Sequence, residues 1–139
     1  MALLQARYPH ARPWVRVSCP VPADRGLKPW LIGRMGAQAL MHLADQAGVP
    51  HSQALVGITD FQGDAQAWLA QARTWLGWVS NRCGVVMMCH PGWLQEDASD
   101  PIAEARAREH EALAGPQWPA LLQQLGWELA RTPSPAGHA

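Results

Sequence analysis

Short runs with the period of a β-strand alternate along this chain with longer runs that have the period of a helix. Residues 14–19 alternate apolar and polar side chains up to Pro20, which lacks the N–H that a sheet ladder needs. Residues 54–59 are rich in β-branched side chains, and residues 84–90 are almost wholly apolar, as in strands buried on both faces. We therefore predict neighbouring parallel strands at residues 15–17, 55–58 and 85–89.

Apolar residues at helical spacing occupy the intervals between these strands. Such residues recur over residues 27–43, where we expect one helix, weakened by Gly33 and Gly36, that ends at Gly48. Further helices are expected after Asp64 as N-cap, from Asp100 and Pro101 to a stop at Gly115 and Pro116, and over residues 118–125.

This order of elements predicts an α/β fold with three to four mainly parallel strands and right-handed crossovers. Residues 126–131 are expected to form a last short strand, and residues 133–139 a loose tail. A chain of 139 residues has the length of a single domain. Because three or four strands do not close a barrel, the pattern indicates a piece of a larger sheet or barrel, with its first strand exposed at one edge and available for self-association or a partner.

Charge and composition exclude several classes of partner. Eleven basic residues balance eleven acidic ones, so no electrostatic field favours nucleic acid or an anionic membrane. No apolar run approaches the length of a membrane span, and the first residues lack the pattern of a signal peptide. The three cysteines form no CxxC pair, which suits free thiols in a reducing compartment. A cytoplasmic protein is therefore expected.

His90 is the strongest candidate for chemistry, because it ends the apolar run at residues 84–90 and is followed by a Pro91–Gly92 turn. Active sites of parallel α/β folds lie at the carboxyl edge of the strands, where an imidazole can exchange a proton near neutral pH. The alternative is a partly buried histidine bonded to a nearby carbonyl. Cys89 cannot form a dyad with His90, because consecutive strand side chains point to opposite faces.

Weaker candidates lie near the other predicted strands. Arg16 could orient a carboxylate by bidentate hydrogen bonds or be a surface arginine. Asp60 and Asp64 suit either metal binding or turn chemistry, but no histidine follows at a short motif spacing, so we expect no complete metal site in this chain. Trp93 could stack on a sugar ring or simply pack. The charged run of residues 106–111 is interpreted as a solvated helix face.

Three segments together resemble the YdjC-like carbohydrate deacetylases, also called the ChbG/HpnK group. These are residues 16–20 (Arg-Val-Ser-Cys-Pro), 57–63 (Gly-Ile-Thr-Asp-Phe-Gln-Gly) and, above all, 84–92 (Gly-Val-Val-Met-Met-Cys-His-Pro-Gly). Asp97, Asp100 and Pro101, and residues 107–113 follow in the order that the family pattern implies. The resemblance covers residues 8–131 and matches the C-terminal half of these enzymes, so residues 1–132 are assigned to that half.

The resemblance implies an irregular (β/α) barrel of the polysaccharide-deacetylase type, in which Mg²⁺ or Zn²⁺ activates water against the carbonyl of an acetamido sugar. In that picture His90 is the general acid that protonates the leaving amine, and Arg16 orients the carboxylate base. Pro91, Gly92, Trp93 and Asp60 are the residues expected to contact the sugar.

The N-terminal half of the family carries the Asp-Asp and histidine motifs of the metal site, and these motifs have no counterpart in this sequence. We therefore expect the chain alone to bind no catalytic metal and to release no acetate. Two interpretations stay open. One is a partial enzyme that works with the missing half, and the other is a non-catalytic α/β module that binds sugar or a protein partner.

Overall fold

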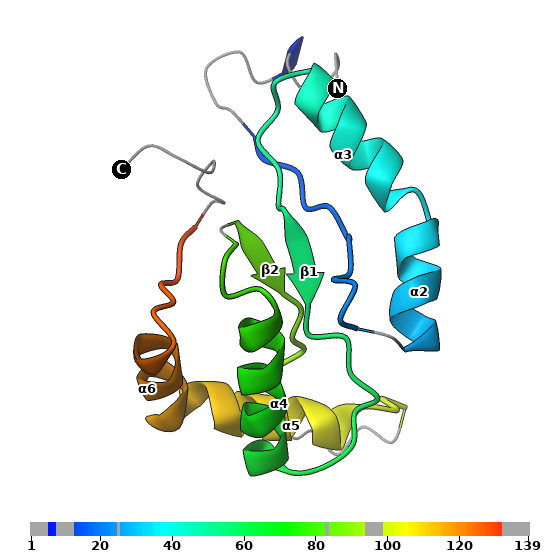
Figure 1. Cartoon of the computed structure of the whole chain (residues 1–139). Helices are drawn as coiled ribbons and strands as arrows, with labels where there is room; N and C mark the ends of the chain where they lie inside the picture. Colours follow the sequence, from blue (N-terminus) through cyan, green and yellow to red (C-terminus); the bar gives the residue numbers. More distant parts are fainter. Residues whose placement is uncertain (1–5, 8–12, 25, 83, 94–98, 132–139) are drawn as a thin grey trace. The chain divides into compact units, whose positions relative to one another are not determined.

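A computed structural model of the chain describes residues 6–7, 13–24, 26–82, 84–93 and 99–131. Five helices and a two-stranded parallel sheet lie within these residues, so the fold is α/β as expected (Figure 1). The chain divides into two compact units. Unit 1 spans Met1–Val56, Asn81–Met87 and Ala130–Ala139, and unit 2 spans Gly57–Ser80 and Met88–Leu129.

The sheet of unit 1 pairs β1 (Ala54–Val56) with β2 (Val85–Met87) in parallel, with Leu55 opposite Val86. Both runs are apolar, and both contain valine, which favours extended backbone. All three β1 residues are buried. The parallel pairing of the second and third predicted strands is therefore confirmed, although each strand is three residues long, shorter than predicted.

The first predicted strand is not a strand, but its segment does lie beside β1. Isolated parallel bridges join Val15 to His51 and Pro20 to Leu55, and the N–H of Leu55 donates to the carbonyl of Cys19 at 2.8 Å. Between these bridges the Ser52 hydroxyl interrupts the ladder, because Oγ accepts the N–H of Val17 at 2.8 Å and donates to its carbonyl at 3.1 Å. A side chain thus bonds the backbone groups that a continuous strand would pair with its neighbour.

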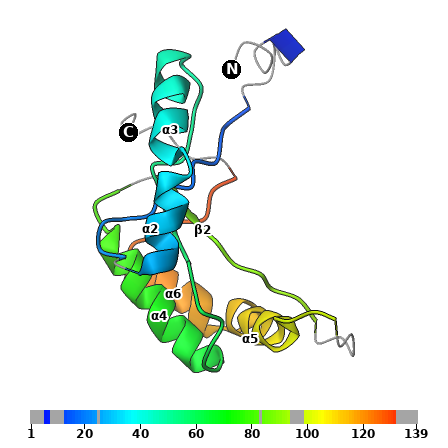
Figure 2. The ribbon, with the colours of Figure 1, turned by 90° about the vertical axis from the view of Figure 1, so that its right-hand side faces the viewer.

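The single helix expected over residues 27–43 is two helices, α2 (Leu27–Arg34) and α3 (Ala37–Gln46). Figures 1 and 2 show them as consecutive helices joined by a short turn. Gly36 lies in this turn with φ 90°, a left-handed conformation that no residue adopts inside a right-handed helix. The prediction of one continuous helix was therefore wrong, and one of the glycines that weakened it marks the break.

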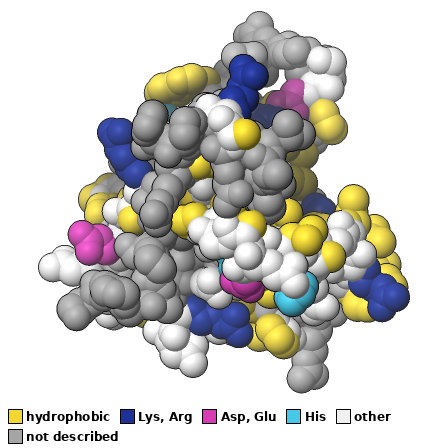
Figure 3. Space-filling model, turned by 90° about the horizontal axis from the view of Figure 1, so that it is seen from above, with side chains coloured by type: hydrophobic (Ala, Val, Ile, Leu, Met, Phe, Trp, Pro, Cys, Tyr) yellow, Lys and Arg dark blue, Asp and Glu magenta, His cyan; other side chains and the backbone are white. Residues whose placement is uncertain are grey.

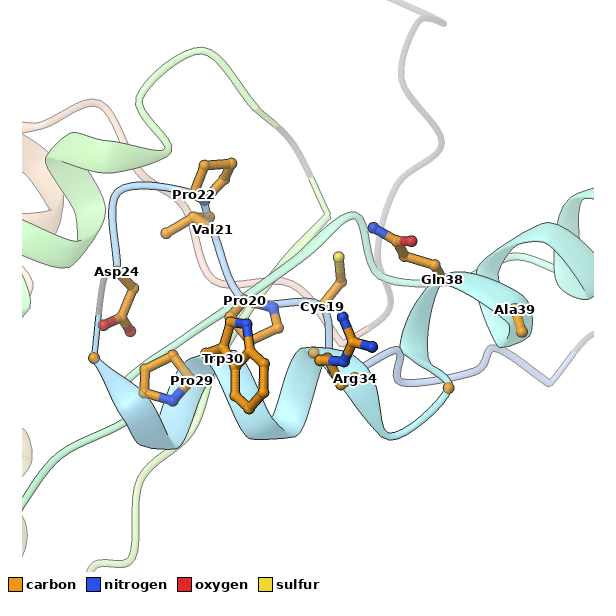
Figure 4. A pocket seen from close by; sticks show the side chains of 13 residues that line it. Cys19, Pro20, Val21, Pro22, Asp24, Pro29, Trp30, Arg34, Gln38 and Ala39 are labelled. Carbon is orange, nitrogen blue, oxygen red and sulfur yellow. The ribbon is translucent and has the colours of Figure 1, made fainter.

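The α2 side of unit 1 carries a groove of about 650 Å³ and several exposed apolar side chains. Figure 4 shows side chains from α2, α3 and residues 19–24 around this groove. The guanidinium of Arg34 lies 5.4 Å from the ring centre of Trp30, a cation–π contact.

Burial raises the pKa of Asp24 above its ordinary value, and a hydrogen bond from Gly26 only partly offsets this. Self-association through unit 1 stays a prediction.

Three packed helices make up most of unit 2, namely α4 (Ala65–Trp78), α5 (Ala103–Ala114) and α6 (Gln117–Gln124). Figure 1 shows α5 crossing α4, with α6 following at the end of α5. Trp68 lies at their centre, edge-on to Trp75 at 6.3 Å and to Trp118 at 5.6 Å between ring centres. Such aromatic pairs contribute about 0.5–1.5 kcal/mol each beyond their buried area. They join α4 to α6.

Local signals set most helix ends in unit 2. Asp64 caps α4 as predicted, because its Oδ1 accepts the N–H of Ala67 at 2.8 Å. Gly115 and Pro116 separate α5 from α6, also as predicted. Helix α5 begins at Ala103, later than expected, because the Asp100 side chain instead accepts the N–H of Ile102 at 3.0 Å in a preceding turn.

The last short strand expected over residues 126–131 is absent from these residues, all of which the structure describes. Gly126, with φ 71°, ends α6, and the N–H of Trp127 turns back to the carbonyl of Leu122 at 2.9 Å. This helix-terminating motif uses the backbone groups that would begin a strand. The tail assigned to residues 133–139 lies outside the described residues. No described helix has the length and apolar character to cross a membrane.

A buried histidine joins the end of α3 to the segment before β1. Nε2 of His51 lies 2.8 Å from Oδ1 of Asp45, and Nδ1 lies 2.9 Å from the carbonyl oxygen of Ser52. Both partners are acceptors, so both ring nitrogens have to donate, which requires the imidazolium form. Burial alone would lower the pKa of His51, but the hydrogen bonds from Asp45 and Ser52 and the charge of Asp45 together raise it.

This contact makes the stability of unit 1 depend on pH. Because the pKa of His51 is raised in the folded chain, the contribution is complete below the unfolded value of about 6.5 and is lost as pH rises through the higher folded value. We expect Asp45→Asn to lower the pKa of His51, measured from its ring C–H signals by NMR. His42→Gln, at an exposed site on the same helix, is the control. An unchanged His51 titration in Asp45→Asn would contradict the assignment.

Candidate functional site

The candidate site lies in unit 2, where the segment around His90 meets the loop that follows β1. Gly57 has φ 91°, and a Cβ there would lie 2.3 Å from the carbonyl oxygen and 2.8 Å from the nitrogen of Met88. Only glycine permits this close approach of two backbones. Gly57 therefore sets the start of its loop directly against the start of the His90 segment.

The loop after Gly57 is held in a strained turn. Phe61 has φ 65°, which is uncommon for a bulky residue, and its N–H donates to Oγ1 of Thr59 at 3.1 Å. Nη2 of Arg108, on α5, donates to the carbonyl oxygen of Phe61 at 2.6 Å. The Phe61 ring lies edge-on to the His90 imidazole, with 5.4 Å between ring centres. Strain of this kind is kept where the surroundings fix a particular side-chain position.

Helix α5 holds the His90 turn from the other side. The backbone N–H of His90 donates to Oε2 of Glu109, and Oε1 of the same carboxylate lies 3.9 Å from Nδ1 of His90. Glu109 is 3% exposed. Nδ1 of His90 is shielded from solvent and has no hydrogen-bond partner among the described residues. The imidazole therefore has one nitrogen directed at a buried carboxylate.

Arg106 fixes both flanks of the same turn. Its Nη1 donates to the carbonyl oxygen of His90 at 3.4 Å, and its own carbonyl accepts the N–H of Gly92 at 3.1 Å. Its Nε donates to Oδ2 of Asp100 at 2.7 Å, which anchors the guanidinium. A Cβ at Gly92 would lie 3.3 Å from the Arg106 side chain, so glycine leaves room for this arrangement.

An aromatic surface follows the turn. Trp93 is 75% exposed, and its ring centre lies 4.1 Å from that of His110 with a tilt of 45°. Pro91 is exposed beside it. Exposed aromatic faces of this kind suit stacking on the apolar face of a sugar ring. The neighbouring Cys89 is a free thiol, and desolvation, followed by the charge of Glu109, raises its pKa, which makes it a poor nucleophile.

The predicted site residues lie in three separate parts of the described chain. His90, Pro91, Gly92 and Trp93 form one continuous segment of unit 2 beside α5. The Asp60 carboxylate accepts the N–H of Gln62 at 3.1 Å and so shapes its own exposed turn. Arg16 is exposed in unit 1, beside β1. A common edge for Arg16, Asp60 and His90 stays a prediction.

Glu109 was assigned from the sequence to a solvated helix face, but it is buried, so that prediction was wrong. The signal that locates it is its spacing, because Ala105, Glu109 and Ala112 recur at i, i+4 and i+7 and all three are buried. An acidic residue on the small, apolar face of a helix needs a donor inside the protein. Arg106 and Arg108 were likewise assigned to solvent, but each donates to a loop carbonyl.

The described residues do not form a site for a divalent metal. No three histidine, cysteine or acidic residues among them converge as ligands. Asp64, the second acid of its loop, uses Oδ1 to cap α4, and Asp60 uses Oδ1 within its own turn. A catalytic Zn²⁺ or Mg²⁺ needs several oxygen or nitrogen donors at bonding distance. We therefore derive no chemical step through a metal held by these residues. Asp97, part of the family resemblance, lies outside the described residues.

Acidic and basic side chains are interspersed on the described part of the face that Figure 3 shows, with hydrophobic ones between them.

Comparison with protein-family models, with curated proteins and with solved structures gives no match to this chain.

The approach of Gly57 to Met88 predicts a large effect of one methyl group. We expect Gly57→Ala to lower the free energy of unfolding by at least about 3 kcal/mol, because the backbone of residue 88 has to move away. Gly126→Ala is the matched control, since Gly126 also has a positive φ but open space around its Cβ, and should cost about 1 kcal/mol. Urea unfolding followed by tryptophan fluorescence measures both. Equal losses in the two variants would show that the two loops are not in contact.

Proposed function

We propose that this chain supplies the proton-donating part of a carbohydrate deacetylase of the YdjC-like type, with His90 protonating the leaving amine of an acetamido sugar. The observation that carries the proposal is the way α5 fixes the His90 turn. Glu109 bonds the N–H of His90 and Arg106 bonds its carbonyl, so the backbone of this residue is held on both sides. A general acid needs such fixed geometry to transfer its proton efficiently.

Two further features support this proposal. The Gly-Val-Val-Met-Met-Cys-His-Pro-Gly segment resembles the family motif at the residue that would act as the acid. The exposed Trp93, whose ring contacts that of His110, lies three residues further along the chain and offers a surface for a sugar ring. Acid and aromatic surface thus lie within four consecutive residues.

Deacetylation needs two contributions, activation of the water and carbonyl, and protonation of the leaving amine. Water adds to the acetamide carbonyl carbon, and the C–N bond then breaks with its electron pair remaining on nitrogen. His90 supplies the proton that this nitrogen needs to leave as an amine, and acetate is the other product. When bound in the complete family fold, a divalent cation would activate the water and polarise the carbonyl. Within this proposal, that part belongs to the N-terminal half of the family, which carries the Asp-Asp and histidine motifs.

Within the same proposal, β1, β2 and the bridged segment before them belong to an irregular (β/α) barrel. Arg16 lies on that segment and is assigned to orient the carboxylate base. The free thiols Cys19 and Cys89 fit a reducing compartment, so we place the protein in the cytoplasm.

Acetate release tests the proposal. We expect a fusion of this chain to the N-terminal half of a YdjC-like deacetylase to release acetate from N-acetylglucosamine oligomers in a metal-dependent manner. In that fusion His90→Ala should lower kcat by about 10²- to 10⁴-fold, the usual contribution of general acid catalysis. His42→Ala, at an exposed site of α3, is the control and should leave kcat unchanged.

Two results would contradict this account. A fusion that folds and binds metal but loses no activity in His90→Ala would remove the acid role from His90. Metal-dependent acetate release by the 139-residue chain alone would show that the chain builds a complete site itself. The exposed Trp93 also favours a second function, a non-catalytic sugar-binding module. Sugar binding that Trp93→Ala abolishes, together with an inactive fusion, would support that second function.

A further inference from the structure

We infer that Glu109 is a positioning residue that keeps a proton on Nδ1 of His90 and so reserves Nε2 for proton exchange with a ligand. The exchange itself rests on the proposed function, but the position of the proton does not. Glu109 has both oxygens turned toward His90, one bonded to its backbone N–H and the other 3.9 Å from Nδ1.

Burial makes the difference in free energy between the forms of the imidazole with and without a proton on Nδ1 large. Glu109 is 3% exposed, and Nδ1 of His90 has no contact with solvent. An unprotonated Nδ1 would direct a lone pair at a carboxylate, placing two acceptors face to face without water between them. A proton on Nδ1 converts this repulsion into attraction to a charged acceptor. The surroundings therefore select the form of the imidazole that carries Nδ1–H.

The distance allows this contact to become a hydrogen bond. A separation of 3.9 Å is less than about 1 Å beyond the normal range for N–H···O bonds, so a small rotation of the ring or carboxylate closes it. The edge-on ring of Phe61 packs against the imidazole and restricts larger rotations. The hydrogen bond from the His90 N–H holds the carboxylate in place while the ring adjusts.

Selecting this form has a direct consequence for proton transfer. When the imidazolium gives its proton to the leaving amine, the proton departs from Nε2, and the product is the neutral Nδ1–H imidazole that Glu109 already favours. No second proton has to move within the protein.

The tautomer of His90 can be observed directly in the intact chain. Long-range ¹H–¹⁵N spectra distinguish Nδ1–H from Nε2–H imidazoles at a pH where His90 is neutral, and loss of one signal set in His90→Gln identifies the residue. Because a hydrogen bond to a charged group is strong, we expect Nδ1–H to exceed Nε2–H by at least about tenfold. A predominantly Nε2–H imidazole in the wild-type chain would overturn the inference without recourse to any variant.

Glu109→Gln should reverse the preference. The glutamine oxygen can still accept the His90 N–H, and its amide then directs a donor at Nδ1, which has to become the acceptor. We expect the Nε2–H form to predominate in this variant, whereas Glu111→Gln, an exposed position on the same helix, should leave the spectrum unchanged. A folded Glu109→Gln chain that keeps Nδ1–H would also overturn the inference. The experiment uses no substrate, so its outcome is separate from that of acetate release.

Discussion

The carboxylate of Glu109 is buried in unit 2, and the arrangement of the candidate site depends on how its charge is satisfied. A buried carboxylate is costly unless donors inside the protein replace its water. Here the donor is the backbone N–H of His90, with the imidazole of the same residue beside it. The cost of leaving Glu109 unpaired therefore keeps the His90 turn against α5.

The rest of α5 strengthens the same constraint. The Arg106 side chain donates to the His90 carbonyl, and the Arg108 side chain donates to the carbonyl of Phe61. The backbone carbonyl of Arg106 also accepts the N–H of Gly92. These charged side chains of one helix thus fix two loops that are distant in sequence. Because the bonds are made to backbone groups of the loops, they position the loop backbone directly, and glycine at position 92 leaves room for the Arg106 side chain. His90 and Phe61 are the residues whose side chains meet as a result.

Much of the fold follows from local signals in the sequence. The apolar runs that form β1 and β2, the capping Asp64 and the break at Gly115 and Pro116 all act over a few residues and were predicted. The interruption of the first strand was not, because it depends on the Ser52 hydroxyl bonding Val17, 35 positions away along the chain. A pattern of apolar and polar residues does not show such a long-range bond.

The candidate site, like the fold, could be predicted from the sequence only in part. His90 could be found from sequence because it ends an apolar run and begins a Pro–Gly turn. Its partners could not, because Glu109, Arg106 and Arg108 stand in a run of charges that is typical of a solvated helix. Only the packing of α5 shows that one of these charges is buried and that two bond to loops. The positive φ of Phe61 likewise follows from the bonds around it.

Backbone amide NMR tests most directly the proposal that the His90 segment forms a binding surface for an acetamido sugar. Titrating the ¹⁵N-labelled chain with N-acetylglucosamine oligomers should shift the amide signals of His90, Gly92 and Trp93 together, with smaller shifts near Phe61. The matching oligomers without acetyl groups should shift them less. Shifts confined to the α2 groove of unit 1, or no shifts at all, would contradict the account.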